Sequence, residues 1–205
     1  MSVDDLALAD ALLAAIETHI VPLTREGVAK GNKLFGAAIL RKADLSLVLA
    51  ATNNEMENPL WHGEMHAIKR LYERPAHERP DPKDCIFLAT HEPCSLCLSA
   101  ITWAGYDNFY YLFSHQDSRD AFAIPHDIRI LREVFQPPSM PDDAPLYNRR
   151  NAFWTGRSIA SLADERDPAP EVEALRHRMK ALGRVYEELS EAYQAGKAGN
   201  AIPLS

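Results

Sequence analysis

Two short clusters of residues have the types and spacing that metal chemistry needs. The first is His62-Gly63-Glu64 and the second is Pro93-Cys94-Ser95-Leu96-Cys97, and each falls where a predicted helix begins. Cys94 and Cys97 are three residues apart, so their sulfurs lie on one face of that helix. A helix N-terminus lowers thiol pKa values and favours the thiolate, the form that binds metals. Two thiolates and the His62 imidazole would give zinc three protein ligands and leave the fourth tetrahedral position for water, as in catalytic zinc sites.

Glu64 supplies the group that such a site needs beside the metal. Zinc lowers the pKa of a bound water from about 15.7 toward about 7. A carboxylate two residues after His62 is well placed to take a proton from that water and pass it to a ring nitrogen and a leaving amine. The simpler alternatives are a redox pair or two core cysteines for Cys94 and Cys97. For Glu64 the alternative is an acidic residue that the helix macrodipole favours.

The residues around these clusters predict alternating helices and strands. Apolar residues near the helical period predict a helix over the first thirty residues, which Pro22 breaks or kinks. Two apolar runs, 35–40 and 45–51, predict a hairpin. Further along the chain, the predicted elements are a helix at 62–73, a strand at 85–89, a helix at 94–104 and a strand at 108–113. This order predicts a three-layer α/β domain with one antiparallel hairpin in a mixed sheet.

The last third of the chain reads differently. Residues 137–145 contain four prolines, which neither a helix nor a central strand accommodates. We therefore predict a main domain at 1–136 and, at 137–205, a Pro-rich junction followed by a C-terminal helical extension with a helix near 170–195. The segment 147–154 mixes aromatic and basic side chains, as a nucleic-acid surface does. Packing against the domain or a partner subunit is the favoured alternative, and a lid over the pocket is a third.

Composition narrows the class of protein. The chain has 205 residues, of which 46% are apolar and 25% charged, and a formal net charge of −7, which argues against a phosphate backbone as the main partner. No run approaches the roughly 20 apolar residues that span a bilayer, and the acidic N-terminus lacks the positive segment of a secretory signal. Three cysteines cannot build an even disulfide framework. We therefore expect a cytoplasmic protein in which Cys85 is an inert core residue.

The combined pattern of His-x-Glu followed by Pro-Cys-x-x-Cys resembles the signature of the cytidine deaminase-like zinc deaminases. The segment Phe35-Gly36-Ala37-Ala38-Ile39 is similar to the family's first strand motif. Thr52-Asn53-Asn54 resembles the segment that carries a substrate-contacting asparagine, and Glu92–Cys97 resembles the branch of guanine, cytosine and tRNA-adenosine deaminases. The resemblance covers residues 5–135 and leaves the C-terminal extension outside it.

This resemblance implies a fold, an activity and a partner. The fold is a three-layer α/β/α arrangement with a mixed five-stranded sheet. Zn2+ would be held by His62, Cys94 and Cys97, with Glu64 as the catalytic acid and base. The activity would be hydrolytic release of ammonia from a free nucleobase or related amino-heterocycle, guanine- or cytosine-like, in a homodimer. A tRNA adenosine deaminase and a catalytically inactive, zinc-stabilised binding subunit are the two alternatives.

The substrate contacts are predicted less directly than the metal ligands. The candidates are Phe35, Asn53, Trp61, Gly63 and His91, with Asn54 as the alternative to Asn53. The backbone amides of Gly63 and Cys94 are implied to orient the substrate and the attacking water. The chain departs from the family in having glycine at 63, where alanine is commoner, and tryptophan at 61, where a small residue is usual. These departures bear on the substrate rather than on the reaction.

Overall fold

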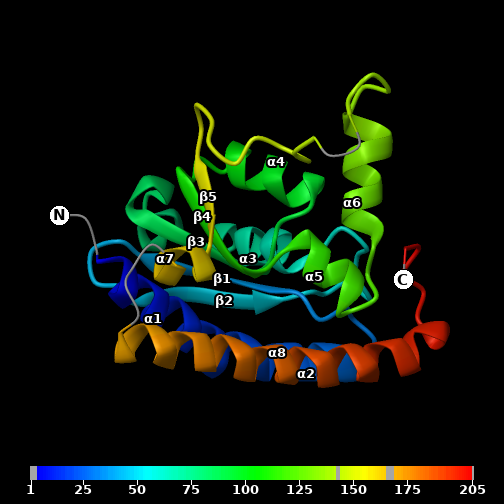
Figure 1. Cartoon of the computed structure of the whole chain (residues 1–205), viewed down its shortest axis with the longest axis horizontal. Coiled ribbons are helices and arrows are strands. Elements are labelled where there is room, and N and C mark those ends of the chain that lie inside the picture. Colours follow the sequence, from blue (N-terminus) through cyan, green and yellow to red (C-terminus); the bar gives the residue numbers. More distant parts are fainter. Residues whose placement is uncertain (1–3, 142–143, 165–168, 205) are drawn as a thin grey trace.

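A five-stranded mixed sheet forms the centre of the molecule (Figure 1). This computed structural model describes residues 4–141, 144–164 and 169–204. The strands are β1 (Gly36–Arg41), β2 (Leu47–Thr52), β3 (Cys85–His91), β4 (Asn108–Phe113) and β5 (Thr155–Ser158), in the spatial order β2-β1-β3-β4-β5. β1 is antiparallel to both β2 and β3, whereas β3, β4 and β5 run parallel. The predicted hairpin and mixed five-stranded sheet are confirmed.

Helices cover both faces of the sheet. The longer helices are α1 (Asp5–Ala15), α2 (Val21–Ala29), α3 (Gly63–Tyr72), α4 (Ser95–Trp103) and α8 (Pro170–Gly196). The shorter α-helices are α5 (His115–Asp120), α6 (His126–Ile130) and α7 (Ile159–Asp164). Two π-helical turns are η1 (Ile16–Ile20) and η4 (Leu131–Phe135). The single 3-10 turns are η2 (Ala76–Glu78), η3 (Pro82–Asp84) and η5 (Lys197–Gly199). Helices α1, α2 and α8 lie on one face and α3 and α4 on the other, so the sheet is the middle of three layers (Figure 1).

The central strands are apolar on both sides because both sides are covered. Every residue of β3 is buried, and so is every residue of β1 except Arg41. Continuous apolar strands are typical of sheets that carry helices on both faces. Alternate side chains enter two separate cores. Leu88 packs toward α1 and α8, while Phe87 and Ala89 pack toward α3 and α4.

The N-terminal helical run continues through Pro22. It is π-helical over Ile16–Ile20, and Pro22 lies in the first turn of α2, where its missing N–H costs least. The predicted break at Pro22 therefore does not occur. The helical pitch changes locally just before it, over Ile16–Ile20. The whole run Asp5–Ala29 is long and apolar enough to cross a membrane by length and composition alone, a test that core helices also pass. Here Leu12, Leu13 and Ile20 are fully buried in the core.

The C-terminal third of the chain contributes to the same sheet and core. β5 pairs with β4 from Asn108–Thr155 to Tyr111–Ser158, and α8 buries one side against α1 and α2. The helix predicted at 170–195 is confirmed by α8. The division into 1–136 and 137–205 remains a prediction about domain boundaries. In space the second part completes the sheet begun by the first.

Candidate zinc-dependent active site

Two helix starts converge on the predicted metal site. His62 is the N-cap residue of α3, and Cys94 is the N-cap residue of α4, its Sγ accepting a hydrogen bond from the backbone N–H of Cys97 at 3.5 Å. A three-residue loop, Glu92 to Cys94, connects the end of β3 to α4. The site thus lies beyond the carboxyl end of a parallel strand, where α/β sheets commonly bind ligands.

The three predicted ligands are brought together. His62 Nδ1 lies 3.4 Å from Cys94 Sγ and 3.8 Å from Cys97 Sγ, and all three ligand atoms fall within 4.8 Å of one another. Two sulfurs and one imidazole nitrogen form the donor set that Zn2+ accepts in a tetrahedral site with one open position. The chain therefore carries an intact zinc-binding group made of His62, Cys94 and Cys97.

The electrostatics of the site favour ligands ready to bind a cation. Contacts with Cys97 and His62 outweigh burial and hold the pKa of Cys94 well below its usual value. Burial alone would lower the pKa of His62, but the adjacent Cys94 and the carboxylates of Glu64 and Glu55 raise it to about 9. The raised pKa of His62 reflects the negative charge of Cys94, Glu64 and Glu55 around it. A divalent cation bound here would neutralise that charge.

Glu64 lies beside the ligand group. Its side chain is buried, and its Oε2 lies 3.4 Å from Cys97 Sγ. Burial, followed by the negative charge of Cys94, raises the pKa of Glu64 to about 7. A carboxyl group with a pKa near neutrality can both give and take a proton at physiological pH. This placement agrees with the predicted catalytic role, which remains a prediction.

Asn53 is held in one orientation by two partners. Its Oδ1 accepts a hydrogen bond from the backbone N–H of Gly63 at 2.5 Å, and its Nδ2 donates to Glu55 Oε2 at 2.8 Å. Glu55 Oε1 forms a buried ion pair with Lys33 Nζ at 2.9 Å, and the same oxygen lies 3.8 Å from His62 Nε2. The Gly63 amide implied to orient substrate therefore already donates to Asn53. Asn54, the alternative contact, instead bonds to Glu57 near the surface.

The remaining predicted contacts divide into two groups. Phe35 and His91 line the cavity at the zinc ligands, together with Glu64, and their rings are 4.5 Å apart. Trp61 is not among the residues that line this cavity, and Lys69 Nζ lies 5.7 Å from its ring centroid. His66, predicted not to be a ligand, pairs through Nδ1 with the carbonyl oxygen of Thr52 at 2.8 Å. Cys85 is fully buried in the core, as predicted.

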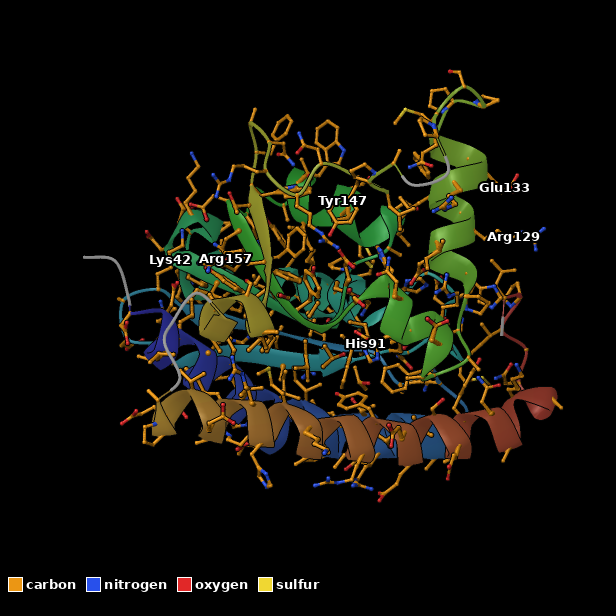
Figure 2. All side chains as sticks on the ribbon, in the orientation of Figure 1. Lys42, His91, Arg129, Glu133, Tyr147 and Arg157 are labelled. Carbon is orange, nitrogen blue, oxygen red and sulfur yellow. The ribbon has the colours of Figure 1, made fainter. Side chains whose placement is uncertain are left out.

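His91 connects the active-site wall to the layer of α8. Figure 2 shows His91 on the side of the sheet that faces α8. Its ring lies 5.3 Å from that of Tyr186 on α8 and 5.0 Å from that of Phe113, and its Nδ1 lies 2.9 Å from Thr90 Oγ1. Its Nε2 has no hydrogen-bond partner among the described residues. Burial holds the pKa of His91 well below its usual value, so the ring is neutral. The C-terminal helix thus touches the wall of the site through one histidine.

Two functional candidates were not predicted from the sequence. Asp127, in the first turn of α6, reaches the same cavity, and burial together with the charge of Cys94 raises its pKa to about 7. Asp127 is two residues after Pro125, and acidic residues are common in the first turn of a helix, so no local signal in the sequence distinguishes it. In the sequence Glu92 is only one residue of the Glu92–Cys97 motif, yet its side chain is fully buried and accepts hydrogen bonds from Tyr147 and Arg149.

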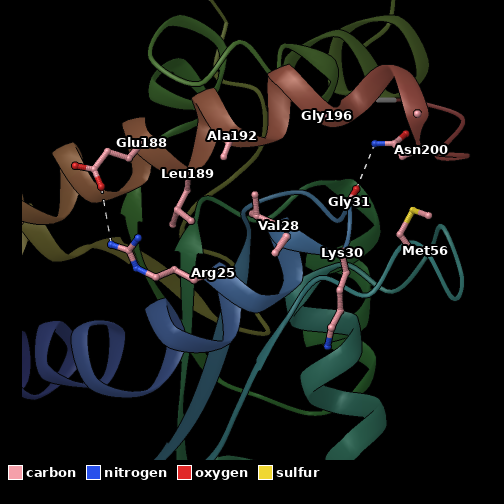
Figure 3. A pocket seen from close by; sticks show the side chains of 12 residues that line it. Arg25, Val28, Lys30, Gly31, Met56, Glu188, Leu189, Ala192, Gly196 and Asn200 are labelled. Carbon is pink, nitrogen blue, oxygen red and sulfur yellow. Dashed lines mark hydrogen bonds and ion pairs between the residues drawn. The ribbon is translucent and has the colours of Figure 1, made fainter.

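A separate, more open cavity of about 570 Å³ lies between α2 and the end of α8 (Figure 3). Arg25 and Glu188 face one another across it at 3.9 Å, and Asn200 donates a hydrogen bond to the carbonyl oxygen of Gly31. None of the zinc ligands lines it. Size alone therefore does not locate the chemistry, which lies in the smaller, enclosed cavity beside Glu64.

Fold and site together define an α/β protein with a His/Cys/Cys zinc-binding group at two helix starts. A family model described as the cytidine and deoxycytidylate deaminase zinc-binding region matches residues 15–113, which include all three ligands. The chain belongs to this family of zinc-binding deaminase domains.

Individual proteins that are similar to the chain include a guanine deaminase. The chain is 34% identical over 104 residues to guanine deaminase of Bacillus subtilis (strain 168), a match that spans 49% of this chain and 64% of that protein. The crystal structure of the Bacillus subtilis guanine deaminase covers 66% of this chain and 86% of its own, with 30% identity and a TM-score of 0.48. A variant of the protein NE0047 in complex with 8-azaguanine has 18% identity, a TM-score of 0.53 and coverage of 86% and 84%.

Proposed function

We propose that this chain is a hydrolytic deaminase of a free, amino-substituted nucleobase, guanine-like in the first instance and cytosine-like as the alternative, and that it releases ammonia. The observation that carries the proposal is the buried carboxyl of Glu64 beside the His62, Cys94 and Cys97 group. A zinc site with a purely structural role would not need an ionisable carboxyl group in the same cavity.

The residues of the site supply the proton transfers of such a reaction. When bound, zinc would provide an activated water at neutral pH. Glu64, with a pKa of about 7, is suited to move both protons of that water. It would take the first proton as the water attacks and give it to the ring nitrogen. It would then take the second proton from the hydroxyl now on the ring carbon and give it to the leaving amine, which departs as ammonia. Phe35 and His91 form flat walls against which an aromatic ring would pack.

The residues that line the cavity favour a small neutral base, rather than a polynucleotide, as the substrate. Its residues include the carboxyl groups of Glu64, Glu92 and Asp127 and contain no lysine or arginine. Nucleic-acid binding depends mainly on Lys and Arg contacts to phosphates. Similarity to a guanine deaminase at 34% identity supports a guanine-like base as the first candidate.

A panel of ammonia-release assays tests the proposed substrate class. The zinc-loaded protein is incubated with guanine, cytosine and adenine, with their nucleosides, with pterins and triazines, and with tRNA. We expect release from at least one free base, guanine first, and none from tRNA. Release only from tRNA adenosine would replace the proposal by the nucleic-acid alternative, and release from no compound would support the inactive binding subunit.

Replacing Glu64 with glutamine isolates the proton transfers. E64Q keeps the size of the side chain but cannot shuttle a proton, so we expect kcat to fall by about 10²- to 10⁴-fold. Zinc content should stay near one ion per chain because Glu64 is not a ligand. The measurement is ammonia release alongside metal analysis of the same sample. Wild-type activity in zinc-loaded E64Q would contradict the role given to Glu64.

We further propose that the active species is a homodimer formed through exposed aromatic residues at the end of α4 and in the segment just before β5. Trp103 is 91% exposed and Phe153 is 68% exposed, and they flank the hydrogen bond from Trp154 Nε1 to Thr102 Oγ1. Exposed apolar groups of this kind mark interaction surfaces. Light scattering should give the mass of two chains for wild type and of one chain for W103E, while F135E, on η4, should remain dimeric. A monomeric wild-type protein would contradict this proposal.

A further inference from the structure

The loop that carries Cys94 is tied to the C-terminal third of the chain through one carboxylate. Tyr147 Oη donates a hydrogen bond to Glu92 Oε1 at 2.5 Å, and Arg149 donates to the same oxygen from Nε at 3.0 Å and from Nη2 at 2.7 Å. The other oxygen, Oε2, accepts from the backbone N–H of His115 at 3.0 Å. Figure 2 shows Tyr147 above the sheet, in the segment that follows α6.

Burial makes these contacts matter. The Glu92 side chain has no exposed surface, and a buried carboxylate without partners costs far more free energy than an exposed one. Among the described residues that donate hydrogen bonds to Glu92, Arg149 is the one with a permanent positive charge, and two of its N–H groups converge on one oxygen. The His115 ring, whose Nδ1 lies 3.4 Å from Glu92 Oε2, has a pKa that burial lowers. Arg149 is itself half-exposed, and its guanidinium lies 5.8 Å from the ring centroids of Tyr111 and Tyr147.

Glu92 is only two residues before a zinc ligand. Its backbone N–H donates to the carbonyl oxygen of Phe113 at 2.7 Å, and the next carbonyl, of Pro93, lies 3.2 Å from His115 Nε2. Two residues of chain span at most about 7 Å, so a displacement of Glu92 also displaces Cys94. Metal–ligand distances tolerate only about 0.2 Å of deviation.

We propose that Tyr147 and Arg149 are positioning residues of the zinc site: by fixing Glu92 they hold the loop that ends at Cys94. The inference rests on the zinc site of the proposed function and is independent of which base is the substrate. It gives a role to the aromatic-basic segment 147–154, which lies beyond the residues that match the family model. The segment thereby contributes to metal binding without contacting the metal.

The test measures zinc affinity in the full-length chain. We compare wild type with the double variant Y147F/R149M and with R157M, which removes another C-terminal arginine that pairs with Asp5 at 3.3 Å, away from the zinc loop. Zinc dissociation constants come from competition with a chromophoric chelator, and spectra of the cobalt-substituted proteins report ligand geometry. Loss of groups that orient metal ligands weakens metal binding by about 10- to 100-fold, and we expect that range for the double variant. R157M should stay within about twofold of wild type.

The result that overturns the proposal is a folded double variant with wild-type zinc affinity and an unchanged cobalt spectrum. If the double variant does not fold, Y147F and R149K decide the matter. R149K keeps the charge but loses the paired N–H geometry, so it should bind zinc more weakly than R157M does. Equal affinity in Y147F, R149K and R157M overturns the proposal. Because no substrate enters this experiment, inactivity toward every base contradicts the proposed function alone.

Discussion

Gly63 lies where the first turn of α3 meets β1, and the space between them has no room for a side chain. A Cβ at Gly63 would lie 2.7 Å from Gly36 Cα and 2.9 Å from both its carbonyl carbon and its amide nitrogen. Backbone atoms of a central strand cannot rotate away as a flexible side chain does. The alanine that is commoner in the family therefore does not fit this backbone without separating α3 from the sheet.

We expect G63A to be less stable than wild type by about 1–3 kcal/mol, the usual cost of overpacking. It should also bind zinc more weakly, because the separation displaces the adjacent ligand His62. Urea unfolding and chelator competition measure the two effects. The matched control is G183A on α8, where a Cβ meets nothing within 4 Å. That variant should gain up to about 1 kcal/mol from the higher helix propensity of alanine. Equal stability of G63A and wild type would contradict the close approach.

At the scale of single residues, the sequence predicted the site residues whose positions depend on local spacing. His62, Glu64, Cys94 and Cys97 are placed by two helix starts, and each start is visible within a few residues of sequence. Asp127 could not be found this way. It reaches the cavity only because the segment after β4 folds back over the site, and that return depends on tertiary packing.

Among the elements, α6 and η4 bury little apolar surface against the rest of the protein. They form one helical stretch over 126–135, all of it described, in which Leu131 is the one buried apolar side chain. Val134 and Phe135 are largely exposed. Helices with few buried contacts open at low free-energy cost. This same stretch brings Asp127 over the zinc ligands.

The cavity beneath this stretch has a volume of about 10 Å³, enough for roughly one water molecule. A nucleobase needs far more room, so the cavity must open for substrate, and we expect α6 to be the element that moves. In hydrogen exchange we expect the amides of 129–135 to exchange faster than those of α4. Saturating E64Q with the base identified as substrate should slow them, while α8 stays unchanged. Exchange in 129–135 as slow as in α4, or no protection by substrate, would contradict a moving α6.

Apolar periodicity predicted β1, β3, β4, α3 and α4 to within a few residues, because each buries an apolar face against a neighbour. β5 was missed. Its sequence, Thr-Gly-Arg-Ser, has no apolar alternation, and it is a strand only because β4 offers an unpaired edge. The π-helical pitch before Pro22 was also beyond a local pattern.

At the scale of the whole molecule, the three layers meet around His91. The residue ends β3, lines the zinc cavity and packs against Tyr186 of α8. Its neutral, buried ring must stay unprotonated while the molecule is folded, whereas in the unfolded chain it titrates near 6.5. Acid therefore favours unfolding through this residue, and the effect extends to the layer of α8.

The pH dependence of stability tests this coupling, and its sign follows from linkage. The pKa of His91 is lowered well below 6.5 by burial, so its contribution to stability is complete above pH 6.5 and is lost as the pH falls from 6.5 toward the folded-state value. Glu64 and Asp127, with pKa values raised to about 7, act in the opposite sense over the same range.

A comparison of variants separates the effect of His91 on stability from that of these two carboxyl groups. Between pH 7.5 and 5.5, wild type should lose about 1.4 kcal/mol more unfolding free energy than H91M, because one proton's uptake costs about 1.4 kcal/mol per pH unit below the unfolded pKa. Urea unfolding of zinc-loaded protein at both pH values measures the difference, and the exposed-histidine variant H77Q should behave as wild type. A loss in H91M equal to that in wild type would show that His91 does not link acid to unfolding.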